Sequence, residues 1–449
     1  MRCRDIYEWA KNYGDPDWFV HDRFGMFIHF GLFSAAARHE WVMTLEQIGA
    51  EKYKKYFDNF NPDFFDAKKW AREAREAGFQ YAVLTAKHHE GFALWDTKLS
   101  EYKITNTKFG RDLVKEYVEA FREEGLKIGL YFSLLDWYHP DFLVDGYHPE
   151  RNNKEYLNDH PGNMESYQKF MHGQVRELLT GYGKIDYLWF DFSYPQRDWG
   201  MSVGKGKDDW ASEELEKMIL SLQPEIILND RLGLGRGVGT FEQYQRSSKD
   251  DNGAKPIIWE ACQTLNNSWG YDRDNLNWKS SEMVLKLLID TVSKGGNMLL
   301  NIGPNGRGEI DKRTQSILDE IKEWMRLHKE AIYGCGPSQY DAPLDARFTQ
   351  KGNHLYLHLF SWPYRTLLLN GLGGEIEYAQ LLNDHSEIQY IQDEGLSGKR
   401  KSHKDLNLEI TEVHIKDTFE DKALLVTLPV QKPDVIVPVI EFILKEQEG

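Results

Sequence analysis

Apolar and polar positions follow two alternating patterns between residues 24 and 303. Short apolar runs, typical of strands buried on both faces of a parallel sheet, alternate with segments whose apolar side chains recur every three to four residues. The second pattern predicts helices, and Gly78 and Gly125 follow two of them where a helix would end. The sequence therefore predicts a β/α fold. Its expected strands are residues 25–29, 81–85, 127–131, 187–191, 226–229, 257–260 and 298–302, and its expected helices are residues 67–77, 111–124, 166–180, 213–222 and 283–293.

Seven strands are clear in this region, and the position of an eighth is left open. The length suits a TIM-type (β/α)8 barrel, which typically takes about 250 residues before insertions. A doubly wound sheet is the competing fold, and it would place a glycine-rich phosphate-binding turn after the first strand. The sequence there is Ile28-His29-Phe30-Gly31, which is no such turn. We therefore expect an α/β barrel over residues 1–335.

The pattern changes after a predicted helix at residues 311–328. Beyond the sequence GCGP at 334–337, apolar and polar residues alternate with period two, as in strands with one buried face. This pattern predicts an antiparallel β-sandwich over residues 336–449. The basic segment at 397–404 is interpreted as a solvent-exposed loop. The expected strands are residues 354–360, 366–369, 375–381, 423–428 and 435–444.

Charge and composition exclude several classes of partner. The 449 residues include 55 Lys and Arg against 71 Asp and Glu, a net charge of −16. Nucleic acids and anionic membrane surfaces need a basic face, so neither is expected as a partner. No apolar run is long enough for a membrane-spanning helix. Aromatic residues make up 13 %, and their flat amphipathic rings suit the faces of sugars as well as ordinary cores.

Cysteine usage points to a reducing compartment. Cys3, Cys262 and Cys335 are odd in number and far apart, so they supply neither a disulfide framework nor a paired metal motif. The first twenty residues lack the basic-then-apolar order of a signal peptide. We therefore expect a cytoplasmic protein.

The predicted strands end in an unusual number of polar residues. Reactive groups of a barrel gather where its strands end, and ionisable groups are costly to bury without a purpose. The set therefore indicates a functional site. It comprises His29, Lys87, His88, His89, Glu90, Tyr131, Asp136, Trp137, Trp189, Asp191, Asp230, Arg231, Glu260 and Asn301.

Asp191 is the most informative of these residues. Alternation along a strand places Tyr187, Trp189 and Asp191 on one face, so the carboxylate is expected to point into the mouth of the barrel. The alternative is that Asp191 only caps the following turn. We favour the functional interpretation because of its neighbours.

His88 and His89 raise the question of a metal site. Adjacent strand residues point to opposite sides, and no HxH or HExxH motif accompanies them. Imidazoles, neutral or charged, that bind substrate hydroxyls explain them better. We expect no metal ion and no cofactor.

The same strand ends carry motifs that resemble the α-L-fucosidases of glycoside hydrolase family 29. The motifs follow the family's order over nearly the whole barrel. They are FGMFIHFG at 24–31, EW at 40–41, YAVLTAKHHEGFALW at 81–95, RDLV at 111–114, GLYFS at 129–133, LWFD at 188–191, NDR at 229–231, WE at 259–260, SWGY at 268–271, GGN at 295–297 and LNIGP at 300–304.

The resemblance implies a retaining exo-hydrolase of terminal α-L-fucosyl residues that acts through a glycosyl-enzyme intermediate and takes fucosylated small molecules or oligosaccharides. The family's nucleophile corresponds to Asp191. Its fucose pocket corresponds to His29, Glu40, Trp41, His88, His89, Tyr131, Trp189 and Arg231. Arg231 and charged imidazoles are expected to keep Asp191 ionised.

Three positions depart from the family pattern. Phe30 stands where Trp is usual, Glu90 replaces the commoner Asp, and Phe192 follows the nucleophile position where Gly is frequent. The first two changes are conservative. Phe192 is expected to narrow the leaving-group side of the site.

The family's general acid/base lies on a segment after the Asn-Asp-Arg motif, at a position that varies. Glu242, eleven residues past Arg231, is the preferred candidate, and Glu260 is the second. The alternatives are an exposed loop carboxylate for Glu242 and a buried partner of an arginine for Glu260. Both residues stay candidates from the sequence.

Three other functions compete with the fucosidase. A sugar-binding protein on a decayed barrel would have lost a carboxylate, whereas Asp191 and both acid candidates are present. A metal-dependent hydrolase or isomerase would use His29, His88 and His89. A glycosidase for a related sugar, such as L-galactose, would need little change of the site.

Overall fold

The computed structural model describes residues 3–246, 255–392 and 422–446. The chain forms two compact units, one comprising Met1–Val284 with Gly296–Glu323 and the other comprising Leu285–Gly295 with Trp324–Gly449. Each unit is described separately below. The boundary expected between residues 335 and 336 stays a prediction.

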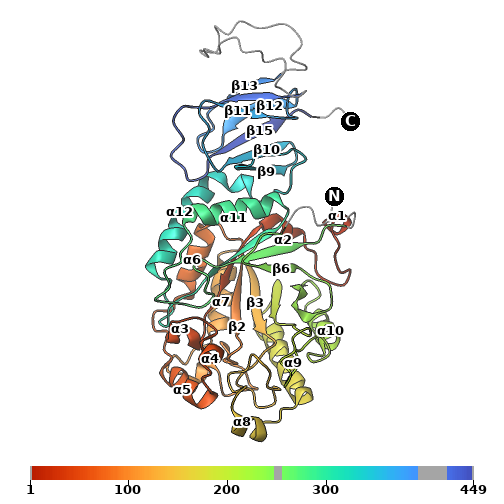
Figure 1. Ribbon diagram of the computed structural model, residues 1–449, viewed down its shortest axis with the longest axis vertical. Helices are drawn as coiled ribbons and strands as arrows, with labels where there is room; N and C mark the ends of the chain where they lie inside the picture. The colour runs from red at the N-terminus through yellow and green to blue at the C-terminus, as the bar shows by residue number, and fades with distance from the viewer. Residues whose placement is uncertain (1–2, 247–254, 393–421, 447–449) are drawn as a thin grey trace. The chain divides into compact units, whose positions relative to one another are not determined.

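Eight parallel strands form the sheet of the first unit, in the order β5-β4-β3-β2-β1-β8-β7-β6 (Figure 1). The two outer strands meet where Asn229, just after β5, bridges in parallel to Val238, just before β6. This bridge closes the sheet and confirms the predicted barrel. The strands are β1 (Phe24–Ile28), β2 (Tyr81–Lys87), β3 (Lys127–Ser133), β4 (Tyr187–Asp191), β5 (Ile227–Leu228), β6 (Gly239–Glu242), β7 (Trp259–Gln263) and β8 (Asn297–Ile302).

Strand β6 is the eighth strand that the sequence pattern did not locate. Its sequence is GTFE, with Phe241 as its only large apolar residue, and most of it is half-buried. Only the short 3-10 helix η2 (Asp230–Leu232) lies between β5 and β6, where a full helix would be expected. The strand predicted at residues 257–260 is also shifted, since β7 begins at Trp259 and continues to Gln263.

The interior of the barrel is aromatic and aliphatic. Strands β1, β4, β7 and β8 are buried along their whole length, which explains their apolar composition. Alternate residues of each strand point inward and pack in one cluster below the strand ends. The cluster comprises Phe19, Phe27, Tyr81, Val83, Tyr131, Tyr187, Trp189, Ile227, Val238, Ile258, Cys262 and Leu299.

The six predicted helices are present, and three of them begin at side-chain caps. Asp66, Asp112 and Asn163 accept hydrogen bonds from the backbone three residues later, at the starts of α6 (Ala67–Glu76), α7 (Leu113–Glu123) and α9 (Met164–Gly181). None of the helices that the structure describes has the length and apolar character needed to cross a bilayer. The other helices are α1 (Cys3–Ile6), α2 (Asp17–Asp22), α3 (Leu32–Ala36), α4 (Val42–Leu45), α5 (Ala50–Asn59), α8 (Lys154–Asp159), α10 (Ser212–Leu222), α11 (Ser281–Ser293), α12 (Lys312–His328), and the 3-10 helices η1 (Ile104–Asn106) and η3 (Lys329–Ala331).

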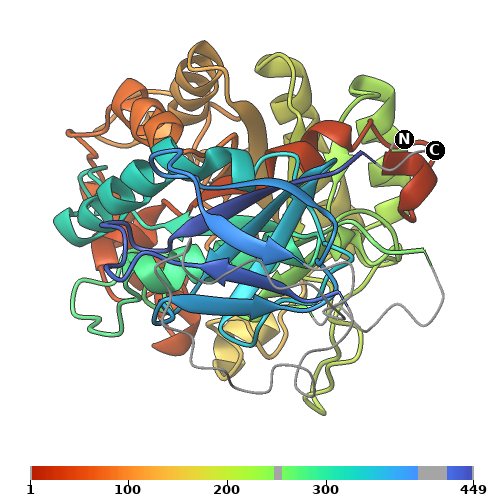
Figure 2. The ribbon, with the colours of Figure 1, turned by 90° about the horizontal axis from the view of Figure 1, so that it is seen from above.

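The second unit contains two antiparallel sheets, in the orders β12-β15-β10-β9 and β11-β14-β13. Their strands are drawn mostly in shades of blue in Figure 2. Leu355 and Phe442 of the first sheet share a core with Leu369 and Val426 of the second, which confirms the predicted sandwich. Strands β9 and β13 were not predicted, and the basic segment at 397–404 lies outside the described residues. The strands are β9 (Ala346–Lys351), β10 (His354–Leu359), β11 (Thr366–Leu369), β12 (Ile376–Leu381), β13 (Gln389–Gln392), β14 (Leu424–Thr427) and β15 (Val439–Leu444).

Candidate active site

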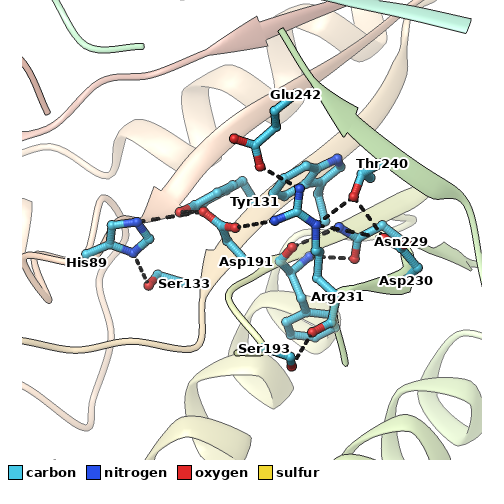
Figure 3. Close-up of polar contacts among 12 residues, drawn as sticks. His89, Tyr131, Ser133, Asp191, Ser193, Asn229, Asp230, Arg231, Thr240 and Glu242 are labelled. Atoms are coloured by element: carbon cyan, nitrogen blue, oxygen red, sulfur yellow. Dashed lines mark hydrogen bonds and ion pairs between the residues drawn. The ribbon is translucent and has the colours of Figure 1, made fainter. Parts of the chain in front are cut away.

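Asp191, the last residue of β4, is the centre of a polar network at the ends of the barrel strands (Figure 3). The Tyr131 hydroxyl donates a hydrogen bond of 2.8 Å to its Oδ2 atom. Nη1 of Arg231 donates to Oδ1 at 3.2 Å, and Nε2 of His89 lies 3.7 Å from Oδ2. The two carboxylate oxygens therefore face different sets of groups, with Arg231 at Oδ1 and with Tyr131 and His89 at Oδ2.

Arg231 joins Asp191 to a second carboxylate. Its Nη2 atom donates to Oε1 of Glu242 at 2.5 Å, and its Nε atom donates to Oγ1 of Thr240 at 2.6 Å. Thr240 and Glu242 both belong to β6, which is held in place by parallel pairing with β7. The Glu242 side chain is 39 % exposed, whereas that of Asp191 is 12 % exposed. One buried and one accessible carboxylate thus share a single guanidinium group.

Burial controls the charges of this network. Burial raises the pKa of Asp191, the positive charge of Arg231 opposes the rise, and the negative charge of Glu242 adds to it. Burial also lowers the pKa of His29 to about 3, and it lowers the pKa values of His88 and His89 well below their ordinary value. The three imidazoles are therefore neutral near pH 7. The prediction that charged imidazoles help to keep Asp191 ionised was wrong. Arg231, which was also predicted to do so, and the hydrogen bond from Tyr131 lower the pKa of Asp191, but burial outweighs them and raises it to about 7.

Glu260 lies inside the barrel, below the exposed part of the site. Its side chain accepts hydrogen bonds from Trp189 Nε1 at 2.7 Å, from the Tyr187 hydroxyl at 2.8 Å and from the Tyr81 hydroxyl at 3.2 Å. The residue is fully buried, and burial raises its pKa to about 7. An acid that protonates a leaving group must reach it. This geometry favours Glu242 over Glu260 for that role.

His29 and Glu40 both contact the loop that follows β7, which includes Trp269 and Gly270. His29 Nδ1 is 2.7 Å from Asn301 Oδ1, and Asn301 Nδ2 donates to the Trp269 carbonyl oxygen at 2.7 Å. Oε2 of Glu40 accepts hydrogen bonds from the backbone nitrogens of Trp269 at 3.0 Å and Gly270 at 2.9 Å. The Trp269 ring lies 5.3 Å from the His29 ring. Trp269 is thus a site residue that was not predicted, although it lies in the SWGY motif.

Aromatic rings form the rest of the site. Tyr131 stacks between His88, with ring centroids 5.6 Å apart, and Trp189, with centroids 5.5 Å apart. The Trp41 ring lies 5.4 Å from His89. Within the described residues, Nδ1 of His88 and Oε1 of Glu40 are buried and make no hydrogen bond, although Oε1 of Glu40 lies 3.3 Å from Nδ1 of His39. Buried polar atoms of this kind are ready to bind hydroxyl groups of a ligand. All ten predicted site residues outside Glu260 therefore lie in one connected set of contacts.

The comparisons with known proteins agree with this geometry. A family model described as alpha-L-fucosidase matches residues 6–330, which include nearly all of the first unit. This chain belongs to the α-L-fucosidase family. The match confirms the family predicted from the motifs and the assignment of the chain as a glycoside hydrolase.

Individual members of the α-L-fucosidase family are similar over most of their length. Human tissue alpha-L-fucosidase is 30 % identical over 380 residues, which cover 79 % of this chain and 77 % of the human one. The structure of alpha-L-fucosidase isoenzyme 1 from Paenibacillus thiaminolyticus has a TM-score of 0.85 at 42 % identity, covering 96 % of this chain and 99 % of that one. A family 29 enzyme from Bacteroides thetaiotaomicron, trapped as a covalent intermediate with 2-fluoro-fucosyl fluoride, has a TM-score of 0.78 at 26 % identity, covering 95 % of each chain.

Two of the three departures from the fucosidase pattern lie behind the site. The Phe30 ring packs in the core against Phe60 and Trp70. Glu90 accepts hydrogen bonds from the Tyr53 hydroxyl at 2.6 Å and from the Leu32 backbone nitrogen at 2.8 Å, so it holds the start of α3. Both side chains therefore support the loops around the site.

Phe192, the third departure, contacts the site directly. Its ring lies 4.9 Å from the His89 ring and 5.5 Å from the Trp41 ring. Its φ angle of 75° is in the left-handed region, which a bulky residue rarely adopts. The ring thus contacts His89, whose Nε2 atom lies 3.7 Å from Oδ2 of Asp191.

Other polar strand-end residues of this family member have structural partners. Lys87 and Asp136 form a fully buried ion pair of 2.9 Å. His29 and His89 direct their Nδ1 atoms to Asn301 and to Ser133, at 2.7 Å in each case. Across residues 3–246, 255–392 and 422–446, no three His, Cys, Asp or Glu side chains are grouped to hold a metal ion.

Proposed function

We propose that this protein is a retaining, exo-acting α-L-fucosidase that hydrolyses terminal α-L-fucosyl residues by double displacement. The observation that carries the proposal is the guanidinium of Arg231, which binds Asp191 and Glu242 at the same time. Retaining hydrolysis needs two carboxyl groups about 5–5.5 Å apart, one as nucleophile and one as acid. A shared guanidinium keeps two carboxyl groups near each other on the same side of the barrel.

In the first step, Asp191 attacks the anomeric carbon of fucose. The bond from this carbon to the leaving oxygen breaks, and Glu242 gives its proton to that oxygen. In the second step, Glu242 takes a proton from water, and the water oxygen attacks the anomeric carbon as the ester to Asp191 breaks. Two inversions at one carbon give net retention.

The charges of the three groups suit this cycle. Arg231 carries one positive charge, so it balances one ionised carboxylate. The set is neutral when Asp191 is ionised and Glu242 carries a proton, which is the state that the first step requires. The negative charge of Glu242 contributes to the raised pKa of Asp191, and the positive charge of Arg231 opposes it.

The neutral groups around Asp191 suit a neutral sugar. The His29 imidazole, Nδ1 of His88 and Oε1 of Glu40 can form hydrogen bonds with hydroxyl groups, and the half-buried rings of Trp41 and Trp269 offer apolar faces. The Bacteroides relative was trapped with 2-fluoro-fucosyl fluoride, which supports fucose as the sugar. Phe192 contacts His89 and Trp41, so we infer that its ring borders the sugar and not the leaving group.

The test is hydrolysis of an aryl α-L-fucoside followed by proton NMR. We expect α-L-fucose to appear first, with the β-anomer formed later by mutarotation. If β-L-fucose appears first, the mechanism is inverting and the proposal fails. Terminal fucosylated oligosaccharides should be cleaved as well, and chelated protein should keep full activity, which separates this proposal from a metal-dependent hydrolase. An aryl α-L-galactoside tests the related-sugar alternative, and we expect a lower kcat/KM for it.

We also infer that the protein acts in the cytoplasm on small imported fucosides. The support is cysteine usage, because Cys3, Cys262 and Cys335 form no disulfide. Fractionation of native cells should recover the activity after lysis. Recovery chiefly from the medium without lysis would contradict this inference.

A further inference from the structure

Glu260 is a buried carboxylate whose partners are all neutral. It is fully buried, and it pairs in register with Thr240 of β6 and Asn297 of β8 inside the closed sheet. Within the described residues, it forms no ion pair with a cation. Its Oε1 atom accepts from Trp189 and Tyr187, and its Oε2 atom accepts from Tyr81. A carboxylate in this place is costly to desolvate, and an apolar side chain would be cheaper.

The shortest of these contacts connects Glu260 to the groups that bind the proposed nucleophile. Trp189 Nε1 donates to Oε1 at 2.7 Å, a distance typical of a hydrogen bond to a charged acceptor. The Trp189 ring also contacts Tyr131 and Arg231. Tyr131 stacks on it with an interplanar angle of 18°, and the Cζ atom of Arg231 lies 5.3 Å from its centroid.

We propose that Glu260 is a positioning residue of the reaction, because it fixes the Trp189 indole and thereby sets Tyr131 and Arg231 against Asp191. Tyr131 and Arg231 donate side-chain hydrogen bonds to Asp191. An indole N–H without an acceptor inside the barrel would cost free energy, and the ring would tilt to find another partner. A small tilt would displace both donors at once. The inference rests on the proposed function, since it concerns the support of the proposed nucleophile.

The test compares Glu260→Gln with Glu260→Ala in the full-length protein, by the pH dependence of kcat/KM on aryl fucosides. The Gln side chain keeps an acceptor for Trp189 and Tyr187, and its amide can donate to the Tyr81 hydroxyl oxygen. The acidic limb is the part of the pH profile in which kcat/KM falls as the pH is lowered and Asp191 becomes protonated. We expect Glu260→Gln to lose less than about 3-fold in kcat/KM and to leave the pH of this limb unchanged. We expect Glu260→Ala to lose about 10- to 100-fold for good and poor leaving groups alike, with the acidic limb moved to higher pH.

Trp189→Phe removes the same hydrogen bond from its other end. We expect it to move the acidic limb in the same direction, and the double variant with Glu260→Ala to be no worse than the poorer single variant. If Glu260→Ala does not fold, Trp189→Phe alone decides. A folded Glu260→Ala protein with the wild-type profile, an unmoved limb in Trp189→Phe, or fully additive losses would overturn the inference. An equal shift of the limb to lower pH in the Gln and Ala variants would also overturn it, because that pattern reports only the lost charge.

These outcomes separate the inference from the proposed function. If the wild-type protein releases no fucose from any substrate, the proposed function fails. If it is a retaining fucosidase and the Glu260 variants match it, only the positioning role fails. A loss in Glu260→Ala that falls mainly on poor leaving groups would make Glu260 the acid, which would overturn both the positioning role and the assignment of Glu242.

Discussion

Nη2 of Arg231 lies 2.5 Å from Oε1 of Glu242, and this contact joins a residue that follows β5 to the last residue of β6. The guanidinium reaches Asp191 with its other terminal nitrogen. The two carboxyl groups therefore depend on one cation, although only Asp191 is deeply buried. Their expected roles differ, and each role has its own kinetic signature.

Asp191→Ala should lower the turnover of aryl fucosides by about 10⁴-fold or more, because no nucleophile remains for the first step. Azide fits the space left by the carboxylate and should restore turnover of reactive aryl fucosides. The product should be a fucosyl azide of inverted configuration, identified by NMR. Wild-type turnover in this variant would show that Asp191 is not the nucleophile.

Glu242→Ala should lower the hydrolysis of natural glycosides by about 10²- to 10⁴-fold, because a poor leaving group needs a proton. Aryl fucosides with acidic phenols should still react in the first step. The glycosyl-enzyme should then accumulate, so a burst of phenol is expected in stopped-flow measurements. The basic limb of the pH profile should disappear, since it reports the group that must be protonated.

Azide provides the matched control for the two carboxylates. In Glu242→Ala it should attack the glycosyl-enzyme and give a fucosyl azide of retained configuration, opposite to the product of Asp191→Ala. Equal configurations from the two variants would mean that the two roles are not divided as proposed.

Tyr131→Phe should move the acidic limb of kcat/KM to higher pH. The Tyr131 hydroxyl donates to Asp191, and this hydrogen bond lowers the pKa of the carboxyl group. Its loss raises that pKa, so a smaller fraction of Asp191 is ionised on the acidic side. We expect kcat/KM to fall by about 10-fold at pH values on the acidic limb, and by less at higher pH, where Asp191 is ionised in both proteins.

Tyr117→Phe is the control for that variant. The Tyr117 hydroxyl is also buried, but it donates to the backbone oxygens of Ala82 and Gly129, away from Asp191. Its removal should lower stability without moving the limb. A similar shift in both variants would show that the limb responds to stability and not to the contact with Asp191.

Phe192→Gly should be more stable than Phe192→Ala by about 1 kcal/mol in the free energy of unfolding. Both changes remove the ring, but only glycine adopts the φ angle of 75° without a steric cost. Urea unfolding of the two variants measures the difference. Phe190 lies in the regular strand β4, where glycine weakens the strand. There we expect the opposite order, with Phe190→Ala more stable than Phe190→Gly. The same order at both positions would contradict the strain at Phe192.

Apolar patterning was sufficient to predict most of the barrel. Strands β1, β2, β4 and β8 are buried along their length, and β3 is buried after its first residue. Burial on both faces demands the apolar runs that are visible in the sequence. Alternation along β4 also placed Trp189 and Asp191 on one face, where the structure has both in contact with Tyr131. Local periodicity carries this information because a strand repeats every two residues.

Other features depend on pairings between distant parts of the chain. Strand β6 carries little apolar pattern, and Glu242 reaches Arg231 only because β6 pairs with β7 in a given register. Glu40 binds the backbone of Trp269, which lies 229 residues away. The neutral state of His88 and His89 follows from burial, and burial depends on every element packed around them. No local pattern records such contacts, because they form only when the strands close into a barrel.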